Sequence, residues 1–234
     1  MQPYLLLDAG GTVLFPNQRV IRQIVLEHGY DVPEEQLQLL MTRFIRYIDG
    51  LLKDDGQQPW GFYDWLLEHA GVDSQVIPAV TAHLHEVDAQ HDLWDFTYPW
   101  VFETLACLTE RGYRISIISN ATGRVEAGLY RAGLGQYLEK VFDSHVVGYE
   151  KPDVRLFQHA LNTLGLRPEE CLFVGDVYYV DVLGANRSGI AAVHLDPYNL
   201  YEGWAGYHIP SVAALPVFLA QQPDLTEKGF FPLA

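Results

Sequence analysis

The first apolar segment of the chain is short and ends at a charged residue. Residues 4–7 (Tyr-Leu-Leu-Leu) form an uninterrupted apolar run, which is typical of a strand that is buried on both faces. Asp8 follows at once, and Gly10 and Gly11 come shortly after it, as expected of a tight loop. The pattern therefore predicts a central strand whose carboxyl end presents an aspartate beside a glycine-rich loop.

Beyond Tyr98-Pro99, segments of helical periodicity alternate with short apolar runs. Pro99 suits the first position of a helix, and glycines close several of the segments that follow. The predicted strands are 113–118, 141–147, 171–174 and 190–195, and the predicted helices are 101–110, 123–132, 154–164 and 180–188. This alternation predicts an α/β fold, a doubly wound, Rossmann-like parallel sheet with helices on both faces.

The segment between the first strand and the alternating region has a different rhythm. From Arg19 to about His91, apolar residues recur at three- and four-residue spacing, which predicts several amphipathic helices. Gly29 and Gly71 mark turns between them. We therefore expect two domains: a Rossmann-like core made of residues 1–15 and 93–234, and a helical cap made of residues 16–92.

Polar side chains stand at the predicted strand ends, where parallel sheets bind their ligands. Asp8, Ser119 and Asp176 each follow an apolar strand, while Lys151 and Asp181 add a positive charge and a further carboxylate. Asp8 with Asp176 would suit a hard cation such as Mg²⁺, which takes oxygen ligands. A carboxylate nucleophile, a hydroxyl, an ammonium and Mg²⁺ together suit transfer of a phosphoryl group through an aspartyl phosphate.

These residues belong to four segments that follow one another along the chain. They are 6–14 (LLDAGGTVL), 117–120 (IISN), 147–153 (VGYEKPD) and 173–176 (FVGD), the last followed by Asp181, Gly184-Ala185 and Gly189. In this order the segments resemble the four motifs of the haloacid dehalogenase-like (HAD) hydrolase superfamily. The resemblance covers residues 4–15 and about 97–197, and it implies a helical cap inserted between the first two motifs.

The resemblance also implies a role for each residue. Asp8 would be the nucleophile, Ser119 would hold the transferring group, and Lys151 would neutralise charge on both. The metal ligands implied for Mg²⁺ are Asp8, Asp176 and the carbonyl of Gly10, with Asp181 in the outer shell or as a further ligand. The loops around the substrate are expected to involve Gly11, Thr12 and Asn120. The cap would close over the site, exclude water and select the substrate.

One position departs from the phosphatases of this superfamily. They carry a second aspartate two positions after the nucleophile, which protonates the leaving group and then activates water, whereas this chain has Gly10 there. A positioned general acid–base contributes about 10²–10⁴-fold to the rate. We expect a Mg²⁺-dependent phosphatase acting on a small phosphorylated metabolite without that aspartate, through a good leaving group such as an acyl phosphate or with a side chain recruited from the cap.

Three alternatives stay open. A 2-haloacid dehalogenase releases halide, which needs no proton, but dehalogenases of the superfamily do not keep the Gly-Asp of the fourth motif. A phosphonatase carries a small residue at the Gly10 position and a cap lysine that forms a Schiff base, and Lys53 is the only lysine in residues 16–92. A non-catalytic relative would bind a phosphorylated ligand or partner.

The composition limits which binding partners and which cellular compartment we expect. Asp and Glu number 30 against 15 Lys and Arg, a net charge of −15, so we expect neither nucleic acid nor membrane as a partner. The expected partner is a small-molecule substrate, bound by a monomer or homodimer. Two cysteines make no disulfide scaffold, the first residues do not resemble a signal peptide, and no apolar run approaches the roughly 20 residues of a membrane span. A cytoplasmic location is therefore expected.

Overall fold

The chain forms two compact units. A computed structural model describes residues 2–54, 61–91 and 93–222. One unit consists of Met1–Leu14 and Thr97–Ala234, and the other of Phe15–Phe96. We call them the core unit and the inserted unit and describe each by itself.

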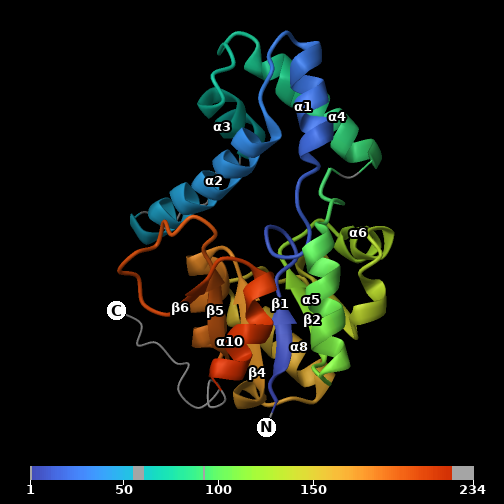
Figure 1. Ribbon diagram of the computed structural model, residues 1–234, viewed down its shortest axis with the longest axis vertical. Helices are drawn as coiled ribbons and strands as arrows, with labels where there is room; N and C mark the ends of the chain where they lie inside the picture. Colours follow the sequence, from blue (N-terminus) through green and yellow to red (C-terminus); the bar gives the residue numbers. More distant parts are fainter. Residues whose placement is uncertain (1, 55–60, 92, 223–234) are drawn as a thin grey trace. The chain divides into compact units, whose positions relative to one another are not determined.

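The core unit is built on a six-stranded sheet in the order β3-β2-β1-β4-β5-β6, with every pairing parallel (Figure 1). The strands are β1 (Tyr4–Leu7), β2 (Ile115–Ser119), β3 (Lys140–Asp143), β4 (Cys171–Gly175), β5 (Ala191–Leu195) and β6 (Tyr207–Ile209). β1 lies in the middle of the sheet, which explains why the first apolar run is uninterrupted. The predicted doubly wound α/β fold is confirmed.

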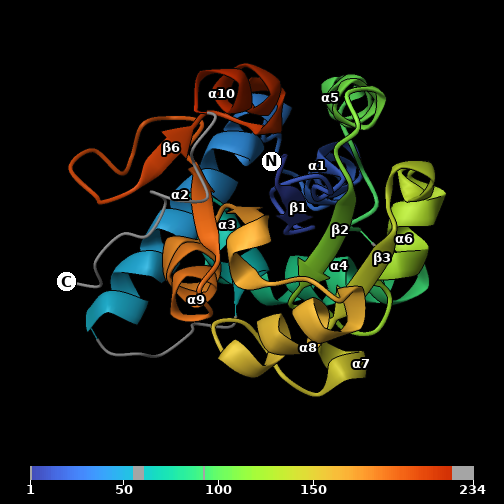
Figure 2. The same ribbon diagram turned by 90° about the horizontal axis from the view of Figure 1, so that it is seen from below.

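Helices cover both faces of this sheet. They are α5 (Pro99–Glu110), α6 (Val125–Arg131), α7 (Ser144–Val147), α8 (Val154–Leu164), α9 (Leu183–Arg187) and α10 (Leu215–Gln221), together with the 3₁₀ turns η1 (Gly135–Tyr137), η2 (Pro168–Glu170) and η4 (Val212–Ala214) and the π-helical turn η3 (Tyr178–Val182). Helices α5 and α10 lie on one face, and α8 and α9 on the other (Figure 2).

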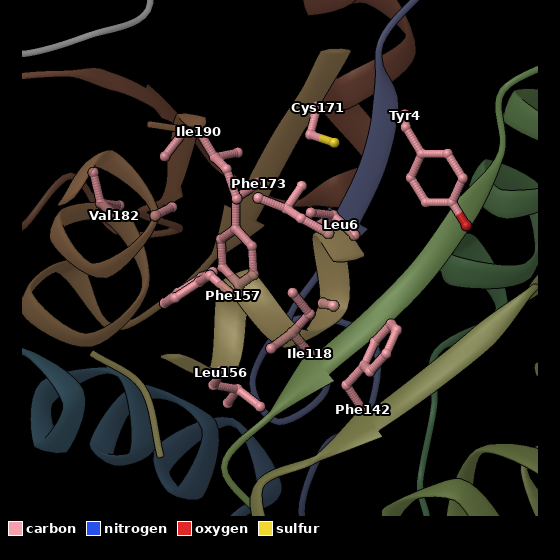
Figure 3. Close-up of a cluster of buried hydrophobic side chains, with 14 of the residues drawn as sticks. Tyr4, Leu6, Ile118, Phe142, Leu156, Phe157, Cys171, Phe173, Val182 and Ile190 are labelled. Atoms are coloured by element: carbon pink, nitrogen blue, oxygen red, sulfur yellow. The ribbon is translucent and has the colours of Figure 1, made fainter. Parts of the chain in front are cut away.

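A cluster of apolar side chains fills the space between the sheet and helices α8 and α9 (Figure 3). Leu6, Ile118 and Phe173 reach it from three neighbouring strands, and all three are fully buried. Phe157 of α8 meets Phe173 edge to face, with ring centroids 5.4 Å apart. This packing fixes α8 against the sheet and so holds the strand ends in place.

The alternating region differs from the expectation in three places. Residues 144–147 form α7 instead of ending a strand, because the carboxylate of Asp143 caps the turn by accepting a hydrogen bond from the His145 N–H at 2.9 Å. The predicted helix 180–188 begins as the π-helical turn η3 and continues as α9. Strand β6 and helix α10 are additional, and both are too short for a periodic pattern to reveal.

The inserted unit is helical over its described residues, in agreement with the amphipathic pattern. Its helices are α1 (Gln18–Glu27), α2 (Glu34–Asp54), α3 (Phe62–His69) and α4 (Ile77–His91). They share an apolar cluster in which Val25, Leu67 and Leu84 are fully buried. No helix in the described part of the chain has the length and apolar character needed to cross a membrane.

The two ends of the inserted unit are joined by a short antiparallel bridge. The Phe15 N–H donates to the Phe96 carbonyl at 2.8 Å, and the Phe96 N–H donates to the Phe15 carbonyl at 3.3 Å. In the core unit, the Thr97 hydroxyl donates to the Val13 carbonyl at 2.8 Å. The chain therefore leaves and re-enters each unit at neighbouring points.

Cys171, the first residue of β4, offers a test of how firmly the sheet is buried. Burial raises the pKa of its thiol to about 12, and the thiolate is the reactive form. We expect iodoacetamide at pH 8 to spare Cys171 in the native protein while the half-buried Cys107 reacts, and to alkylate both in urea. Peptide mass spectrometry measures both sites, and equal native rates would contradict the burial of β4.

Candidate active site

The residues singled out in the sequence gather at one edge of the core-unit sheet. Asp8 follows β1, Ser119 is the last residue of β2, and Asp176 follows β4. Because β1 pairs with β2 on one side and with β4 on the other, these three strand ends are neighbours. The strand order runs outward in opposite directions from β1, which is where open α/β sheets bind ligands.

Lys151 joins two of the carboxylates. Its Nζ lies 2.6 Å from Oδ1 of Asp8 and 2.7 Å from Oδ1 of Asp181. All three residues are buried, and Asp181 has no exposed surface. Burial would lower the pKa of the Lys151 ammonium, but the attraction of Asp181 and Asp8 outweighs it and raises that pKa. The ammonium therefore stays charged at neutral pH and orients Asp8.

Burial acts on two of the carboxyl groups in the opposite sense to its effect on the ammonium: it disfavours their charged form and so raises their pKa. Burial raises the pKa of Asp8 to about 6; Lys151 opposes the rise and Asp181 adds to it. Burial, followed by repulsion from Asp8 and Asp181, raises the pKa of Asp176 well above its usual range. Among the described residues, only one ammonium lies beside these three acidic side chains, so a bound cation would favour the ionised forms of the carboxyl groups.

The oxygen atoms present fit a hard cation. Asp8, Asp176 and Asp181 each offer an oxygen within 4.8 Å of the other two, the one such cluster of potential metal ligands in the described ranges. Oδ1 of Asp176 is buried and has no hydrogen-bond partner among the described residues, as expected of an oxygen that serves a ligand. Both Asp181 oxygens accept hydrogen bonds, from Lys151 and from the Val177 N–H at 2.9 Å. These contacts suit Asp181 to the outer shell.

Two glycines leave the space that the acidic side chains occupy, because a side chain at either position would collide with a carboxylate. Gly11 has a φ of +74°, and a Cβ there would collide with the carboxylate of Asp176. A Cβ on Gly175 would lie 2.5 Å from the carboxylate carbon of Asp181.

The loop after β1 also contains the other two predicted residues. Gly10 is half-buried, and Thr12 is fully buried, with no hydrogen-bond partner for its hydroxyl among the described residues.

Asn120 holds the main chain of Lys151. Its Nδ2 donates to the Lys151 carbonyl at 2.9 Å, and its Oδ1 accepts from the Lys151 N–H at 2.7 Å. The loop that carries Asn120 is itself fastened by Asp143, which accepts from the Gly123 N–H, and by Ser144, which accepts from the Ala121 N–H. Substrate contact by Asn120 stays a prediction, whereas its hold on Lys151 is a feature of the structure.

Three residues that support the site were not predicted from the sequence. Asp143 and Ser144, at the end of β3, fasten the Asn120 loop, but the apolar residues around them suggested a strand. His194 of β5 contacts the main chain of Asp176 through Nε2 at 2.9 Å. A histidine interrupting an apolar strand was the available signal, and it does not identify the partner.

Comparison with known proteins shows which family this chain belongs to. A model of haloacid dehalogenase-like hydrolases matches residues 4–189. A glyceraldehyde 3-phosphate phosphatase from Methanopyrus kandleri is 31% identical over 204 residues, which cover 82% of each chain. A glyceraldehyde 3-phosphate phosphatase from Methanothermobacter thermautotrophicus is 37% identical over 97 residues, which cover 41% of this chain and 43% of that relative. The (S)-2-haloacid dehalogenase 1 of a Pseudomonas species is 28% identical over 225 residues. The aligned region covers 91% of this chain and 94% of the dehalogenase.

A solved structure agrees in fold. The HAD phosphatase from Thermococcus onnurineus superimposes with a TM-score of 0.57 at 24% identity, over 94% of this chain and 98% of its own. The present chain therefore has the architecture of a Rossmann-like α/β hydrolase. It has a helical insertion after the first strand and a cluster of acidic residues at one edge of its sheet. The chain belongs to the haloacid dehalogenase-like hydrolase family, and it is an enzyme of that class.

Proposed function

We propose that this hydrolase removes phosphate from a small phosphorylated metabolite through an aspartyl phosphate on Asp8, in a reaction that depends on Mg²⁺. Two observations on one acidic cluster carry the proposal: Asp8, Asp176 and Asp181 each offer an oxygen within 4.8 Å of the others, and Oδ1 of Asp176 is buried with no hydrogen-bond partner among the described residues. Displacement of halide requires no cation site of this kind, whereas phosphoryl transfer benefits from one. The phosphatases among the relatives also favour this reaction.

In the proposed reaction, a carboxylate oxygen of Asp8 attacks phosphorus, and the bond from phosphorus to the leaving oxygen breaks with its electron pair. The Ser119 hydroxyl donates to a phosphoryl oxygen, and Lys151 holds Asp8 and offsets the charge. Water then attacks the phosphorus, releasing phosphate and restoring Asp8. Bound Mg²⁺, held by Asp8, Asp176 and the Gly10 carbonyl, would supply positive charge that stabilises the phosphoryl oxygens.

We further propose that the inserted unit, Phe15–Phe96, is the cap that selects the substrate. The loop residues Gly11 and Thr12 would direct N–H groups towards the phosphate, since glycine lets the backbone approach an anion closely. A small molecule suits this site, and a net charge of −15 disfavours polyanionic macromolecules.

One assay tests the reaction class. Phosphate release is measured from a panel of phosphomonoesters and acyl phosphates, with Mg²⁺ and with chelator, beside halide release from a short 2-haloacid. We expect phosphate release that the chelator abolishes. Halide release that resists the chelator would overturn the proposal in favour of dehalogenation, the reaction named for the Pseudomonas relative. No release from either set of compounds would mean that the enzyme acts on a substrate outside them.

The phosphonatase alternative makes a separate demand. It requires a Schiff base on Lys53, an exposed residue near the end of α2. On the phosphatase proposal, Lys53→Ala keeps full activity, and borohydride added with a phosphonoaldehyde traps no covalent adduct.

A Gly10→Asp variant tests whether the missing acid limits the rate. Because an aspartate there would protonate a poor leaving group, we expect hydrolysis of alkyl phosphates to rise by about 10²–10⁴-fold and that of acyl phosphates to change little. Steady-state kinetics on both substrate classes measure the difference. An unchanged alkyl phosphate rate in a folded variant would mean that another group already supplies the proton.

A further inference from the structure

His194 lies near the carboxyl end of β5, within the sheet and beside the proposed site. The strand register places it opposite Gly175 of β4 and His208 of β6. Its side chain has no exposed surface. The rings of Tyr178, Tyr201 and His208 surround it at centroid distances of 5.6, 4.3 and 5.1 Å. A polar side chain buried in this way needs hydrogen-bond partners.

The main chain of Asp176 is one of these partners. Nε2 of His194 lies 2.9 Å from the Asp176 carbonyl oxygen. A carbonyl oxygen only accepts, so Nε2 carries the hydrogen. The other ring nitrogen, Nδ1, lies 3.0 Å from Nδ1 of His208, whose own Nε2 lies 3.2 Å from the Trp204 carbonyl oxygen.

The peptide group between Asp176 and Val177 is thus held at both ends. Its carbonyl accepts from His194, and its N–H donates to Oδ2 of Asp181 at 2.9 Å. The other Asp181 oxygen accepts from Lys151, the partner of the nucleophile. One unbroken series of hydrogen bonds therefore runs from β5 to the nucleophile, and it passes through the main chain of the proposed metal ligand.

We propose that His194 is a positioning residue, which fixes the Asp176–Val177 peptide group and thereby aims the Asp176 carboxylate at the cation site. The inference rests on the proposed function for the cation, and it adds a residue outside the four motifs. Without the His194 N–H, the Asp176 carbonyl would be buried with no donor, and the peptide group would rotate towards another one. The main chain that carries the Asp176 carboxylate, which lies against Gly11, would then no longer be fixed.

The test compares Mg²⁺ affinity with fold. Dissociation constants for Mg²⁺ are measured by calorimetry on phosphate-free protein, and circular dichroism and melting temperature report the fold. We expect His194→Phe to raise the Kd about 10–100-fold, the usual effect of losing an outer-shell partner, and His194→Gln, which retains a side-chain N–H, to restore most of the affinity. A folded His194→Phe variant with the wild-type Kd would overturn the inference.

Tyr4→Phe is the matched control. It removes a buried hydrogen bond between the Tyr4 hydroxyl and Ser116 Oγ, 2.6 Å long, at the amino-terminal end of β1. We expect this variant to lose stability and keep the wild-type Kd. A weaker Mg²⁺ affinity in both Tyr4→Phe and His194→Phe would assign the loss to general destabilisation and overturn the inference.

Two further measurements separate the inference from the proposed function. Asp176→Asn should lose Mg²⁺ binding; if it binds Mg²⁺ as the wild type does, the cation site itself is wrong and the inference falls with it. Nitrogen-15 NMR of the wild-type imidazole reports the tautomer of His194 without any variant. The inference requires hydrogen on Nε2, and hydrogen on Nδ1 alone would overturn it even if no variant folds.

Discussion

Replacing Asp8 with asparagine is expected to abolish hydrolysis and leave the fold intact. Asparagine has nearly the same shape as aspartate, but its amide is not a competent nucleophile, so the rate should fall on the order of 10⁴-fold or more. The fold should persist because Lys151 keeps its ion pair with Asp181, 2.7 Å long. Phosphate release measures the first effect, and circular dichroism with thermal melting measures the second.

Asp31→Asn is the control for this substitution. Asp31 is an exposed partner of Arg22 in the inserted unit, so the same chemical change there should leave turnover unaltered. Rapid-quench mass spectrometry adds direct evidence, since a phosphorylated Asp8 peptide should appear in the wild type and in Asp31→Asn alone. Full activity of the Asp8→Asn variant would refute the proposed mechanism.

Replacing Lys151 with methionine is expected to cause the largest loss of stability. The change leaves Asp8 and Asp181 buried without their cation, and breaking a buried ion pair in this way typically costs about 3–5 kcal/mol. The pKa of Asp8 in the folded variant then lies further above its unfolded value, because Lys151 lowers that pKa in the wild type. The folded variant therefore binds more protons than the unfolded chain, and its stability falls as pH rises.

Urea unfolding at pH 5 and pH 8 measures this effect. The loss of unfolding free energy relative to the wild type should be smaller at pH 5, where the buried Asp8 carboxyl group takes up a proton. Lys140→Met is the control: Lys140 is exposed on β3, and its loss should change stability by no more than about 0.5 kcal/mol. A loss for Lys151→Met that is the same at both pH values would point to packing rather than charge.

Much of the fold could be predicted because it follows from local pattern. The run at 4–7 identified β1, and periodicity closed by Gly165 identified α8 with its observed bounds, Val154–Leu164. The convergence of Asp8, Ser119 and Asp176 also followed, because parallel strands place their carboxyl ends at one edge. Here a short sequence pattern and a general rule of topology were sufficient.

The remaining features depend on contacts that leave no periodic pattern. Asp181 falls in a π-helical turn in which its own N–H donates to the Val177 carbonyl at 2.7 Å, and this turn directs its carboxylate to Lys151. An α-helical pattern would have allowed an exposed acid there. Asn120 and His194 act on main-chain atoms, which every residue possesses, so the identity of the partner is not encoded in its side chain.

The bridge between Phe15 and Phe96, with the Val13–Thr97 hydrogen bond in the core unit, makes the inserted unit an interchangeable part. Both passages of the chain between the units occur at adjacent points, so residues 15–96 could be excised and the remaining ends rejoined by a short turn without altering the order of the strands. The same site would accept the corresponding segment of a relative. If the inserted unit selects the substrate, as we propose, a chimaera built at this junction would change the substrate preference and keep the chemistry of the core unit.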